Sequence, residues 1–386
     1  MMVEQSPILL EVKNLNVDYL ASNGTVHAVT DVSFTLRRGE ILGLAGESGS
    51  GKSTLAYAIA RLLRPPAQIT SGEILYYPQS SRNQDDVRET SLPKRRGFRT
   101  SKGQVPADEV IDLLQLSPAQ LRSIRWNDLA IVFQSAMNAL NPVMTVGAQI
   151  LDVLWTHRPD MGADFRKQRA AELLQLVGIA PDRMRSYPHE LSGGMRQRAI
   201  IAIALALSPE ILIMDEPTTA LDVVVQRDIL TEIMRLRKKL GFAVIFITHD
   251  LSLLLELADQ VAIMYAGRIV EKASQHSLHQ HPRHPYSYGL LHSFPTLHGP
   301  RQKMSGIPGS PPDLRNVPFG CAFHPRCPSA FDVCSQVLPV LQPAVSSIPE
   351  QIAACHLYDP RFRTEPPSTD DLTKSYQTLS EGSIIS

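Results

Sequence analysis

The chain has 386 residues, 43% of them hydrophobic, and its 38 basic side chains balance 38 acidic ones. This length allows two or three domains, and the balanced charge gives no overall attraction to nucleic acid or to an acidic partner. Its longest apolar runs are far shorter than the ~20 residues that span a bilayer, and the N-terminus lacks the basic start and apolar core of a signal peptide. We therefore expect a cytosolic chain, or one held on the inner side of a membrane by a partner.

The first part of the chain predicts strands and then a glycine-rich turn. Residues 8–45 alternate β-rich runs with turns at "ASNG" and "RRG". The later run "KSTLAYAIARLL" has helical spacing and stops before "RPP", because proline cannot continue a helix. The sequence therefore predicts a strand, a loop and a helix over 41–63.

Residues 79–108 are polar, have almost no aliphatic side chains and show no periodicity, which predicts a flexible loop. The loop contains "KRRGFRTSK", with five basic residues in nine. A solvated loop is the simpler interpretation, and contact with anionic lipid head groups or nucleic acid is the alternative.

The rest of the chain divides into four parts. Residues 110–190 are mainly helical in pattern and predict an inserted helical subdomain. From "ILIMDEP" to "FAVIFITHD" the order is strand, helix, strand, and near-continuous apolar strands indicate a parallel sheet covered on both faces. Frequent prolines and all the cysteines predict a second small domain over about 280–360. The polar residues 361–386 predict a disordered tail.

The stretch "GESGSGKST", residues 46–54, predicts a phosphate-binding loop. Gly46 and Gly51 let backbone N–H groups turn inward without steric cost, and the helix that follows aims its positive end at the same place. Lys52 then neutralises charge on the β- and γ-phosphates, and the Ser53 hydroxyl is a ligand for Mg²⁺. The alternative, a glycine-rich turn with a solvated lysine, fits the strand and helix on either side less well.

Two acidic residues and a histidine follow neighbouring apolar strands. Asp215 ends the strand in "ILIMDEP" and is placed to hold Mg²⁺, and Glu216 is placed to act as general base on the attacking water. His249 closes the next strand in "FITHD", at the sheet edge where ligands bind, and is assigned to the γ-phosphate. Helix capping by the acidic pair and a structural histidine are the simpler alternatives.

A second anion-binding helix terminus is predicted at "ELSGGMRQR". A serine N-cap would explain Ser192 but not the two glycines, Gly193 and Gly194, that follow it. The first loop already has enough donors for one triphosphate. Two phosphate-capping helices therefore suggest that two chains share each nucleotide.

In this order, the phosphate loop, "LSGGMRQR" and "ILIMDEPTTALD" resemble the motif set of ABC ATPases over residues 8 to about 270. The resemblance implies an α/β fold, with a P-loop NTPase core, an antiparallel β subdomain, the inserted helical subdomain and the small C-terminal cysteine-containing domain. It also implies that Tyr19 stacks on adenine and that Gln134 contacts Mg²⁺ and the attacking water. The candidate ATP-binding residues are Tyr19, Gly46, Ser48, Gly49, Gly51, Lys52, Ser53, Thr54, Gln134 and Asp215.

The same resemblance implies a cycle shared by two subunits. Ser192, Gly193 and Gly194 would cap the γ-phosphate held by the opposite subunit, and Asp222 would couple the two sites. ATP binding would close the pair and hydrolysis would reopen it, because only the closed state makes both sets of contacts.

The C-terminal part, with "HPRHPYSYGLL", "GCAFHPRCPSAFDVC" and "ACHLY", is similar to the ATP-binding subunits of bacterial oligopeptide/dipeptide importers. This resemblance implies a second ATPase subunit, identical or not, two transmembrane permease subunits and an extracytoplasmic peptide-binding protein. It places the chain at the cytoplasmic face of the inner membrane as a peripheral subunit, with no nucleic acid expected. A related importer of nickel or another small solute is an alternative, and a soluble ABC protein acting on ribosomes or nucleic acid is a weaker one.

Four cysteines, all within residues 321–355, suggest a metal site in a chain without other cysteines. By the same resemblance, Cys321, Cys327, Cys334 and Cys355 would hold a [4Fe–4S] cluster. Structural Zn²⁺ and free thiols remain the alternatives, and Zn²⁺ usually has more closely spaced cysteine pairs.

Overall fold

The computed structural model describes residues 6–22, 24–78, 99–100, 103–104, 110–134, 139–219, 221–293, 306–344, 348, 350–363 and 365–382. Most of the polar stretch 79–108, for which we predicted a flexible loop, lies outside these residues. Its described part is one short antiparallel pair, β5 (Arg99–Thr100) with β6 (Gly103–Gln104).

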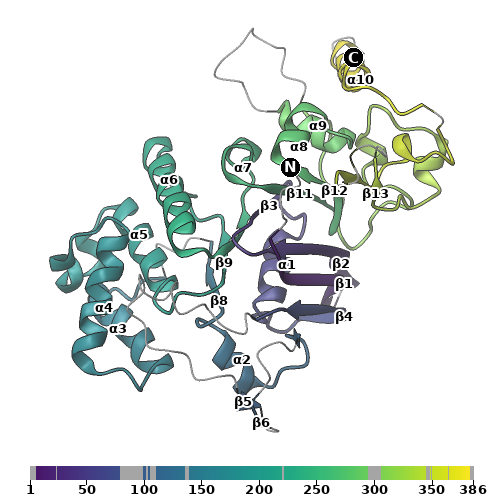
Figure 1. Ribbon diagram of the computed structural model, residues 1–386. Coiled ribbons are helices and arrows are strands. Elements are labelled where there is room, and N and C mark those ends of the chain that lie inside the picture. Colours follow the sequence, from purple (N-terminus) through teal and green to yellow (C-terminus); the bar gives the residue numbers. More distant parts are fainter. Residues whose placement is uncertain are drawn as a thin grey trace.

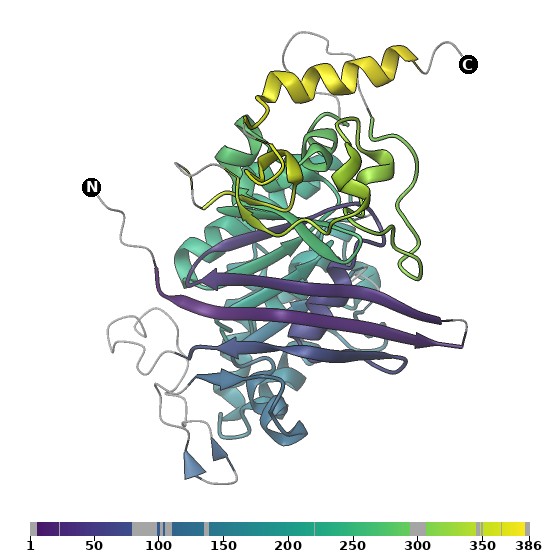
Figure 2. The same cartoon turned by 90° about the vertical axis from the view of Figure 1, so that its right-hand side faces the viewer.

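An antiparallel sheet forms the N-terminal layer, with strand order β2-β1-β4-β7. Its two long strands lie side by side in Figure 2. Along β1 buried residues such as Leu10, Val12, Leu15 and Val17 face the interior, as expected for a sheet covered on one face only. The strands are β1 (Ile8–Ala21), β2 (Gly24–Arg37), β4 (Ala67–Tyr76) and β7 (Ile111–Asp112).

An eight-stranded sheet, ordered β13-β14-β12-β11-β3-β10-β9-β8, forms the centre. Strands β8, β9, β10, β3 and β11 run parallel, and their side chains are buried on both faces. In β3, Leu42 and Leu44 pack toward the antiparallel sheet, whereas Ile41 and Ala45 pack on the opposite face. The predicted parallel sheet is therefore confirmed. Its strands are β3 (Ile41–Ala45), β8 (Leu129–Val132), β9 (Ile211–Asp215), β10 (Ala243–Ile247), β11 (Gln260–Tyr265), β12 (Arg268–Ser274), β13 (Gln342–Pro343) and β14 (Ile352–Ala353).

Helices cover both faces of this sheet. On one face α1 (Lys52–Ile59) packs between it and the antiparallel layer. On the other lie α6 (Val223–Leu240) and α7 (Leu251–Leu257). The sequence signals for α6 are confirmed: Asp222 caps its start, and Gly241 ends it with φ 72°, a left-handed conformation that glycine adopts without strain.

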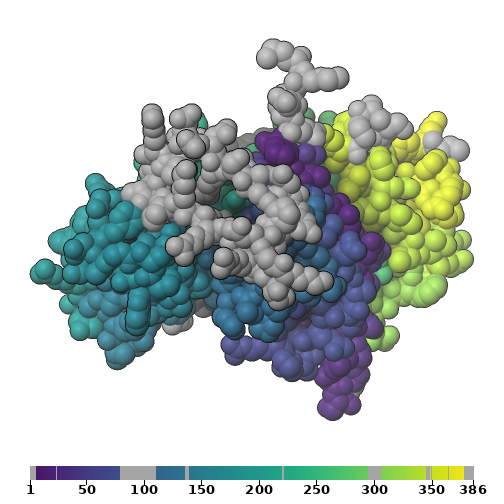
Figure 3. All heavy atoms as spheres, turned by 60° about the horizontal axis from the view of Figure 1, so that its bottom comes forward, coloured from purple at the N-terminus to yellow at the C-terminus, as the bar shows by residue number. Residues whose placement is uncertain are grey.

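A helical region, α3 to α5, lies at one end of the molecule and the C-terminal part at the other (Figures 1 and 3). The prediction of one helical insertion over 110–190 is wrong at its start, because β7 joins the antiparallel sheet and β8 the central sheet. The helices are α2 (Pro118–Ile124), α3 (Val146–His157), α4 (Ala163–Leu176) and α5 (Gly193–Ala204), with 3-10 turns at Pro181–Arg185 and Pro188–Glu190.

The C-terminal region, meaning the described residues from 275 onward, is attached to the central sheet through β14, which pairs with β12. The prediction of a disordered tail over 361–386 is wrong, because α10 spans Thr369–Gly382. This helix buries Leu372 and Tyr376, and the Tyr376 hydroxyl donates to the Pro285 carbonyl at 2.9 Å. The other helices are α8 (Gln275–Gln280) and α9 (Pro285–Leu291), with 3-10 turns at His324–Arg326, Asp332–Ser335 and His356–Tyr358.

Among the helices in the described ranges, none combines the length and the apolar character that crossing a lipid bilayer requires.

Candidate active site

The turn between β3 and α1 has a backbone that only glycine fits at two positions. Gly46 has φ 146° and Gly51 has φ 100°. A Cβ on Gly46 would lie 2.2 Å from the Met264 carbonyl oxygen, and one on Gly51 would lie 2.2 Å from the Ala28 carbonyl oxygen. Both glycines therefore shape the loop through conformation and through close approach of neighbouring backbone. Ser48 and Gly49, at the crest of the loop, are exposed.

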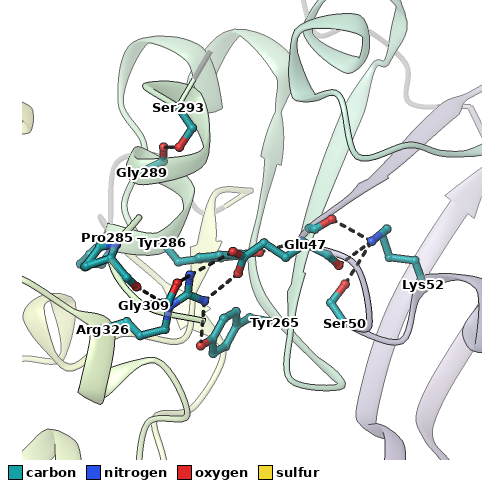
Figure 4. Close-up of polar contacts among 12 residues, drawn as sticks. Glu47, Ser50, Lys52, Tyr265, Pro285, Tyr286, Gly289, Ser293, Gly309 and Arg326 are labelled. Atoms are coloured by element: carbon teal, nitrogen blue, oxygen red, sulfur yellow. Dashed lines mark hydrogen bonds and ion pairs between the residues drawn. The ribbon is translucent and has the colours of Figure 1, made fainter. Parts of the chain in front are cut away.

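Lys52 opens α1 and points its amine into the concave side of this loop (Figure 4). The side chain is buried, and Nζ donates to the carbonyls of Gly46 at 2.7 Å and Glu47 at 2.8 Å and to Ser50 Oγ at 3.2 Å. Burial lowers the pKa of Lys52, against the pull of the carboxylates of Glu47 and of the acidic pair at the end of β9. The amine is thus held where the loop would enclose an anion.

Asp215 is the last residue of β9 and lies beside Ser53, the second residue of α1. Ser53 Oγ donates to Asp215 Oδ1 at 3.0 Å, and Asp215 is fully buried. Burial raises the pKa of Asp215, while the hydrogen bond from Ser53 opposes that rise. Asp215 Oδ2 is buried and has no hydrogen-bond partner among the described residues. The Ser53 hydroxyl and the unpaired Oδ2 of Asp215 together form a set of oxygen ligands that fits Mg²⁺.

Glu216 lies close to three polar side chains, two of which, Gln134 and His249, are predicted site residues. Its Oε2 accepts from Gln134 Nε2 at 3.1 Å and from Thr219 Oγ1 at 3.0 Å, and its Oε1 lies 3.4 Å from His249 Nδ1. The backbone of Glu216 has φ 46°, a strained conformation for a non-glycine residue, and its N–H donates to the Ile247 carbonyl of β10 at 2.9 Å. The structure therefore unites the predicted Gln134, Glu216 and His249.

Tyr19, near the end of β1, is joined to the phosphate loop helix. Its hydroxyl lies 3.1 Å from Thr54 Oγ1, within hydrogen-bond distance. The ring is partly exposed. Tyr19 and Thr54 are both predicted site residues. They lie beside the phosphate loop, where β1 of the antiparallel sheet approaches α1.

The predicted residues of the second terminus cap helices within the chain. Ser192 caps α5 by accepting a backbone N–H three residues on at 3.3 Å, and Asp222 caps α6 in the same way at 3.0 Å. A Cβ on Gly194 would lie 2.7 Å from Val225 Cγ1, so the starts of α5 and α6 are packed together. Within the described ranges, no hydrogen bond joins either cap to the phosphate loop. Gly193 is the first residue of α5, which Figure 1 shows well apart from α1.

The four cysteines line one small cavity together with His284 and Phe323. All four are free thiols. Burial raises the pKa of Cys321 to about 11 and that of Cys327 to about 12, and neighbouring thiols add to both shifts. Burial also raises the pKa of the other two cysteines. In the part of the chain that the structure describes, no three His, Cys, Asp or Glu side chains are arranged to hold a metal ion.

A partly buried ion pair beside the phosphate loop was missed by the sequence analysis. Arg326 donates to both carboxylate oxygens of Glu47, at 2.7 and 2.9 Å, although the two residues are 279 positions apart. The Tyr286 hydroxyl accepts the Glu47 N–H at 2.8 Å. Nothing in the local sequence pattern signals a contact over this separation. Next to it lies a cavity of about 290 Å³, lined by Gly46, Glu47, His249, Leu290, Ser293 and Ile307.

Comparison with known proteins identifies the class that this fold and site define. Residues 29–219 match the family model described as "ABC transporter". The chain also resembles a solved dimeric structure of the ATP-binding cassette MJ0796 bound to ADP and Pi. That likeness has a TM-score of 0.54 and 25% identity and covers 69% of this chain and 99% of the other. The chain is an ABC-type ATPase.

Similarity over nearly the full length gives the particular family. Residues 270–334 match the model "Oligopeptide/dipeptide transporter, C-terminal region". The oligopeptide transport ATP-binding protein OppD of Bacillus subtilis is 43% identical over 84% of this chain and 83% of its own length. The dipeptide transport ATP-binding protein DppD of Lactococcus lactis subsp. cremoris is 39% identical over 95% of each chain. The chain belongs to the family of oligopeptide and dipeptide transport ATP-binding proteins.

Proposed function

We propose that this chain hydrolyses ATP to energise the uptake of dipeptides and oligopeptides across the bacterial cytoplasmic membrane. The cluster of Gln134, Glu216 and His249, beside buried Asp215 and Lys52, carries the hydrolytic part of the proposal. The peptide part is supported by the match of the C-terminal region and by relatives named for oligopeptide and dipeptide transport.

Binding of the nucleotide uses the loop and its neighbours. Lys52 and the N–H groups of the turn after Gly46 neutralise the β- and γ-phosphates, and the partly exposed ring of Tyr19 stacks on adenine. Ser53 and Asp215 would hold Mg²⁺, with Gln134 as a further ligand. Bound Mg²⁺ neutralises charge that develops on the phosphate oxygens. The remaining loop contacts are assigned to Ser48, Gly49, Gly51 and Thr54.

Hydrolysis needs a base at the γ-phosphate, and Glu216 is that base. Its carboxylate accepts a proton from water as the water oxygen attacks phosphorus and the bond to the ADP oxygen breaks. Gln134 and Thr219 hold Glu216 Oε2 by hydrogen bonds, which leaves Oε1 to face the water. His249, 3.4 Å from Oε1, contacts the γ-phosphate and orients the same carboxylate.

The second set of phosphate contacts comes from another subunit. Ser192, Gly193 and Gly194 cap the γ-phosphate bound by the partner ATPase, and Asp222 links the two sites. The separation of the α5 terminus from the phosphate loop within one chain supports this arrangement, as does the dimeric form of the similar MJ0796 structure. ATP then favours the closed pair, because only that state makes both sets of contacts.

The other partners follow from the importer class. A second ABC ATPase, identical or not, and two membrane permease subunits hold this chain at the cytoplasmic face of the membrane, and an extracytoplasmic peptide-binding protein delivers the peptide. Relatives named as peptide transport ATP-binding proteins support these partners.

Replacing the base tests the hydrolytic part. Glu216→Gln keeps the shape and the hydrogen bond from Gln134 but cannot take the proton, so ATPase activity should fall by at least about a hundredfold. Mg–ATP binding should persist, and the variant should accumulate as a closed dimer in size-exclusion chromatography with ATP. Thr231→Ala, at an exposed position in α6 whose hydroxyl bonds to the Arg227 carbonyl of the same helix, is the matched control. Wild-type turnover by Glu216→Gln would remove Glu216 from the role of base.

Transport itself decides among the substrate classes. The complex, reconstituted in vesicles with its permeases, should take up labelled dipeptides or oligopeptides when ATP is enclosed on the cytoplasmic side. Uptake of Ni²⁺ instead of peptide would favour the small-solute alternative. Co-purification with ribosomal material rather than membrane subunits would favour the soluble alternative.

We also propose that Cys321, Cys327, Cys334 and Cys355 bind a metal centre, a [4Fe–4S] cluster with Zn²⁺ as the alternative. The support is that all four thiols line one cavity, where burial raises the pKa of Cys321 and Cys327 and neighbouring thiols add to the rise, a repulsion that a bound cation would reverse. The described geometry does not itself meet the requirements of a metal site. Anaerobically purified protein should contain iron and absorb broadly in the visible. Zinc without colour would select the alternative, and absence of both metals would overturn the proposal.

A further inference from the structure

Glu47 occupies an unusual position in the phosphate loop. Its backbone carbonyl accepts from Lys52 Nζ at 2.8 Å, while its carboxylate points the opposite way, into the C-terminal region (Figure 4). A carboxylate in this loop is unfavourable for binding a triphosphate, because it repels the phosphates and competes for the lysine. The field of Glu47 does act on Lys52, where it opposes the lowered pKa that burial causes. Something must therefore neutralise Glu47 and keep it turned away.

Arg326 meets both requirements. Its guanidinium makes a two-pronged ion pair with the Glu47 carboxylate, at 2.7 and 2.9 Å, and only 6% of the arginine side chain is exposed. Such paired hydrogen bonds fix direction as well as charge. Burial lowers the pKa of Arg326, but its hydrogen bonds with Glu47 and Tyr265 outweigh burial and raise it, so the charge is retained.

The other donors of the guanidinium are held by the C-terminal region and by the central sheet. In the C-terminal region it donates to the carbonyls of Pro308 at 2.7 Å and Gly309 at 3.3 Å, and at the end of β11 it donates to the Tyr265 hydroxyl at 3.2 Å. The Phe323 ring packs 5.8 Å from its central carbon. Every donor of Arg326 is therefore directed by its surroundings, and the arginine cannot follow Glu47 if the loop moves.

We propose that Arg326 is a positioning residue of the ATP site, which neutralises Glu47 and holds it away from Lys52. The C-terminal region thereby completes the phosphate loop from outside the ATPase core. This inference rests on the proposed ATP binding and assigns a role to residues that touch no reacting atom.

The proposal predicts an order of affinities for Mg–ATP, measured on the full chain by titration with a fluorescent ATP analogue. Arg326→Gln leaves the Glu47 carboxylate uncompensated beside the phosphates, and its Kd should rise by at least about tenfold, or about 1.4 kcal/mol. Glu47→Gln removes the ion pair with Arg326 but also removes the charge that repels the phosphates, so its Kd should change by less than about threefold. The double variant Glu47→Gln/Arg326→Gln should bind more tightly than Arg326→Gln alone.

Two further variants separate this role from simple loss of packing. Glu47→Asp keeps the charge but is too short for the paired contact, so it should bind Mg–ATP more weakly than Glu47→Gln, and it leaves the C-terminal region untouched if Arg326→Gln fails to fold. Arg315→Gln breaks an exposed pair with Asp313 in the same region and should bind like wild type. In ATPase assays the effect of Arg326→Gln should fall on KM, with kcat retained.

Three results would overturn the proposal while leaving ATP binding intact. These are wild-type affinity of folded Arg326→Gln, a double variant weaker than Arg326→Gln, and a Glu47→Asp variant that binds as tightly as Glu47→Gln. A wild-type chain that fails to bind Mg–ATP would instead refute the proposed function.

Discussion

Helix α10 gives a prediction of defined size, because Tyr376 attaches it to the C-terminal region through both a buried ring and a hydrogen bond. Tyr376 is 1% exposed, packs with its ring 5.2 Å from that of Tyr288, and donates to the Pro285 carbonyl at 2.9 Å. A 14-residue helix is marginal in water by itself, so its order depends on this docking. Figure 2 shows α10 lying across the outer surface of the C-terminal region.

Tyr376→Ala removes a buried aromatic ring, a change that costs ~3–5 kcal/mol in protein cores. Tyr376→Phe removes only the hydroxyl and its hydrogen bond to the Pro285 carbonyl, which costs ~0.5–1.5 kcal/mol. Since each ~1.4 kcal/mol is a factor of ten, amide hydrogen exchange in α9 and α10 should accelerate by at least about a hundredfold in Tyr376→Ala and by less in Tyr376→Phe.

Hydrogen exchange followed by mass spectrometry measures these rates peptide by peptide. The matched control is Asp370→Ala, an exposed position in the first turn of the same helix, which should cost less than ~1 kcal/mol. Exchange in Tyr376→Ala within about threefold of wild type would contradict the docking argument, because that change amounts to well under 1 kcal/mol.

Three other predictions concern the ATP site. Gly46→Ala should abolish measurable Mg–ATP binding, because the added Cβ would lie 2.2 Å from the Met264 carbonyl; binding at wild-type affinity would contradict the loop geometry. Asp215→Asn should remove the dependence of nucleotide affinity on Mg²⁺ in titrations with and without EDTA, because it removes the charge that holds the ion; retained dependence would count against Asp215 as a ligand. Gly194→Ala should lower the free energy of unfolding by ~1–3 kcal/mol through the contact with Val225 Cγ1, and Val225→Ala should restore it in the double variant, so an unrescued loss would exclude that contact as the cause.

Much of the ATPase fold and of its site could be predicted, because the sequence signals for them are local. The glycines and lysine of residues 46–52 lie between a strand and a helix, and the cap residues of α6 stand directly at its ends. Glu216 and His249 were assigned from their positions after neighbouring parallel strands, and the structure brings them to 3.4 Å. Chain order and sheet geometry are enough for such contacts, because carboxyl ends of parallel strands meet at one edge.

The features that could not be predicted depend on contacts between distant parts of the chain, which sequence patterns do not encode. Strand β8 is a run of four residues within a helix-rich stretch, and its pairing with β9 decides its state. The apolar stripe of α10 consists largely of Leu372 and Tyr376, one helical turn apart in a polar segment, and only the surface that they cover reveals their role. The pair of Glu47 and Arg326 crosses 279 positions, so neither motif signals the other.

The strand pairing between β12 and β14 limits how this protein can be shortened. Glu271 and Lys272 pair with Ala353 and Ile352, and the Ala354 N–H donates to the Val270 carbonyl at 2.8 Å. A version cut after β12 would turn this strand into an open sheet edge with unpaired backbone groups. Open edges of this kind recruit strands from other molecules, so the shortened protein should aggregate rather than behave as a minimal ATPase.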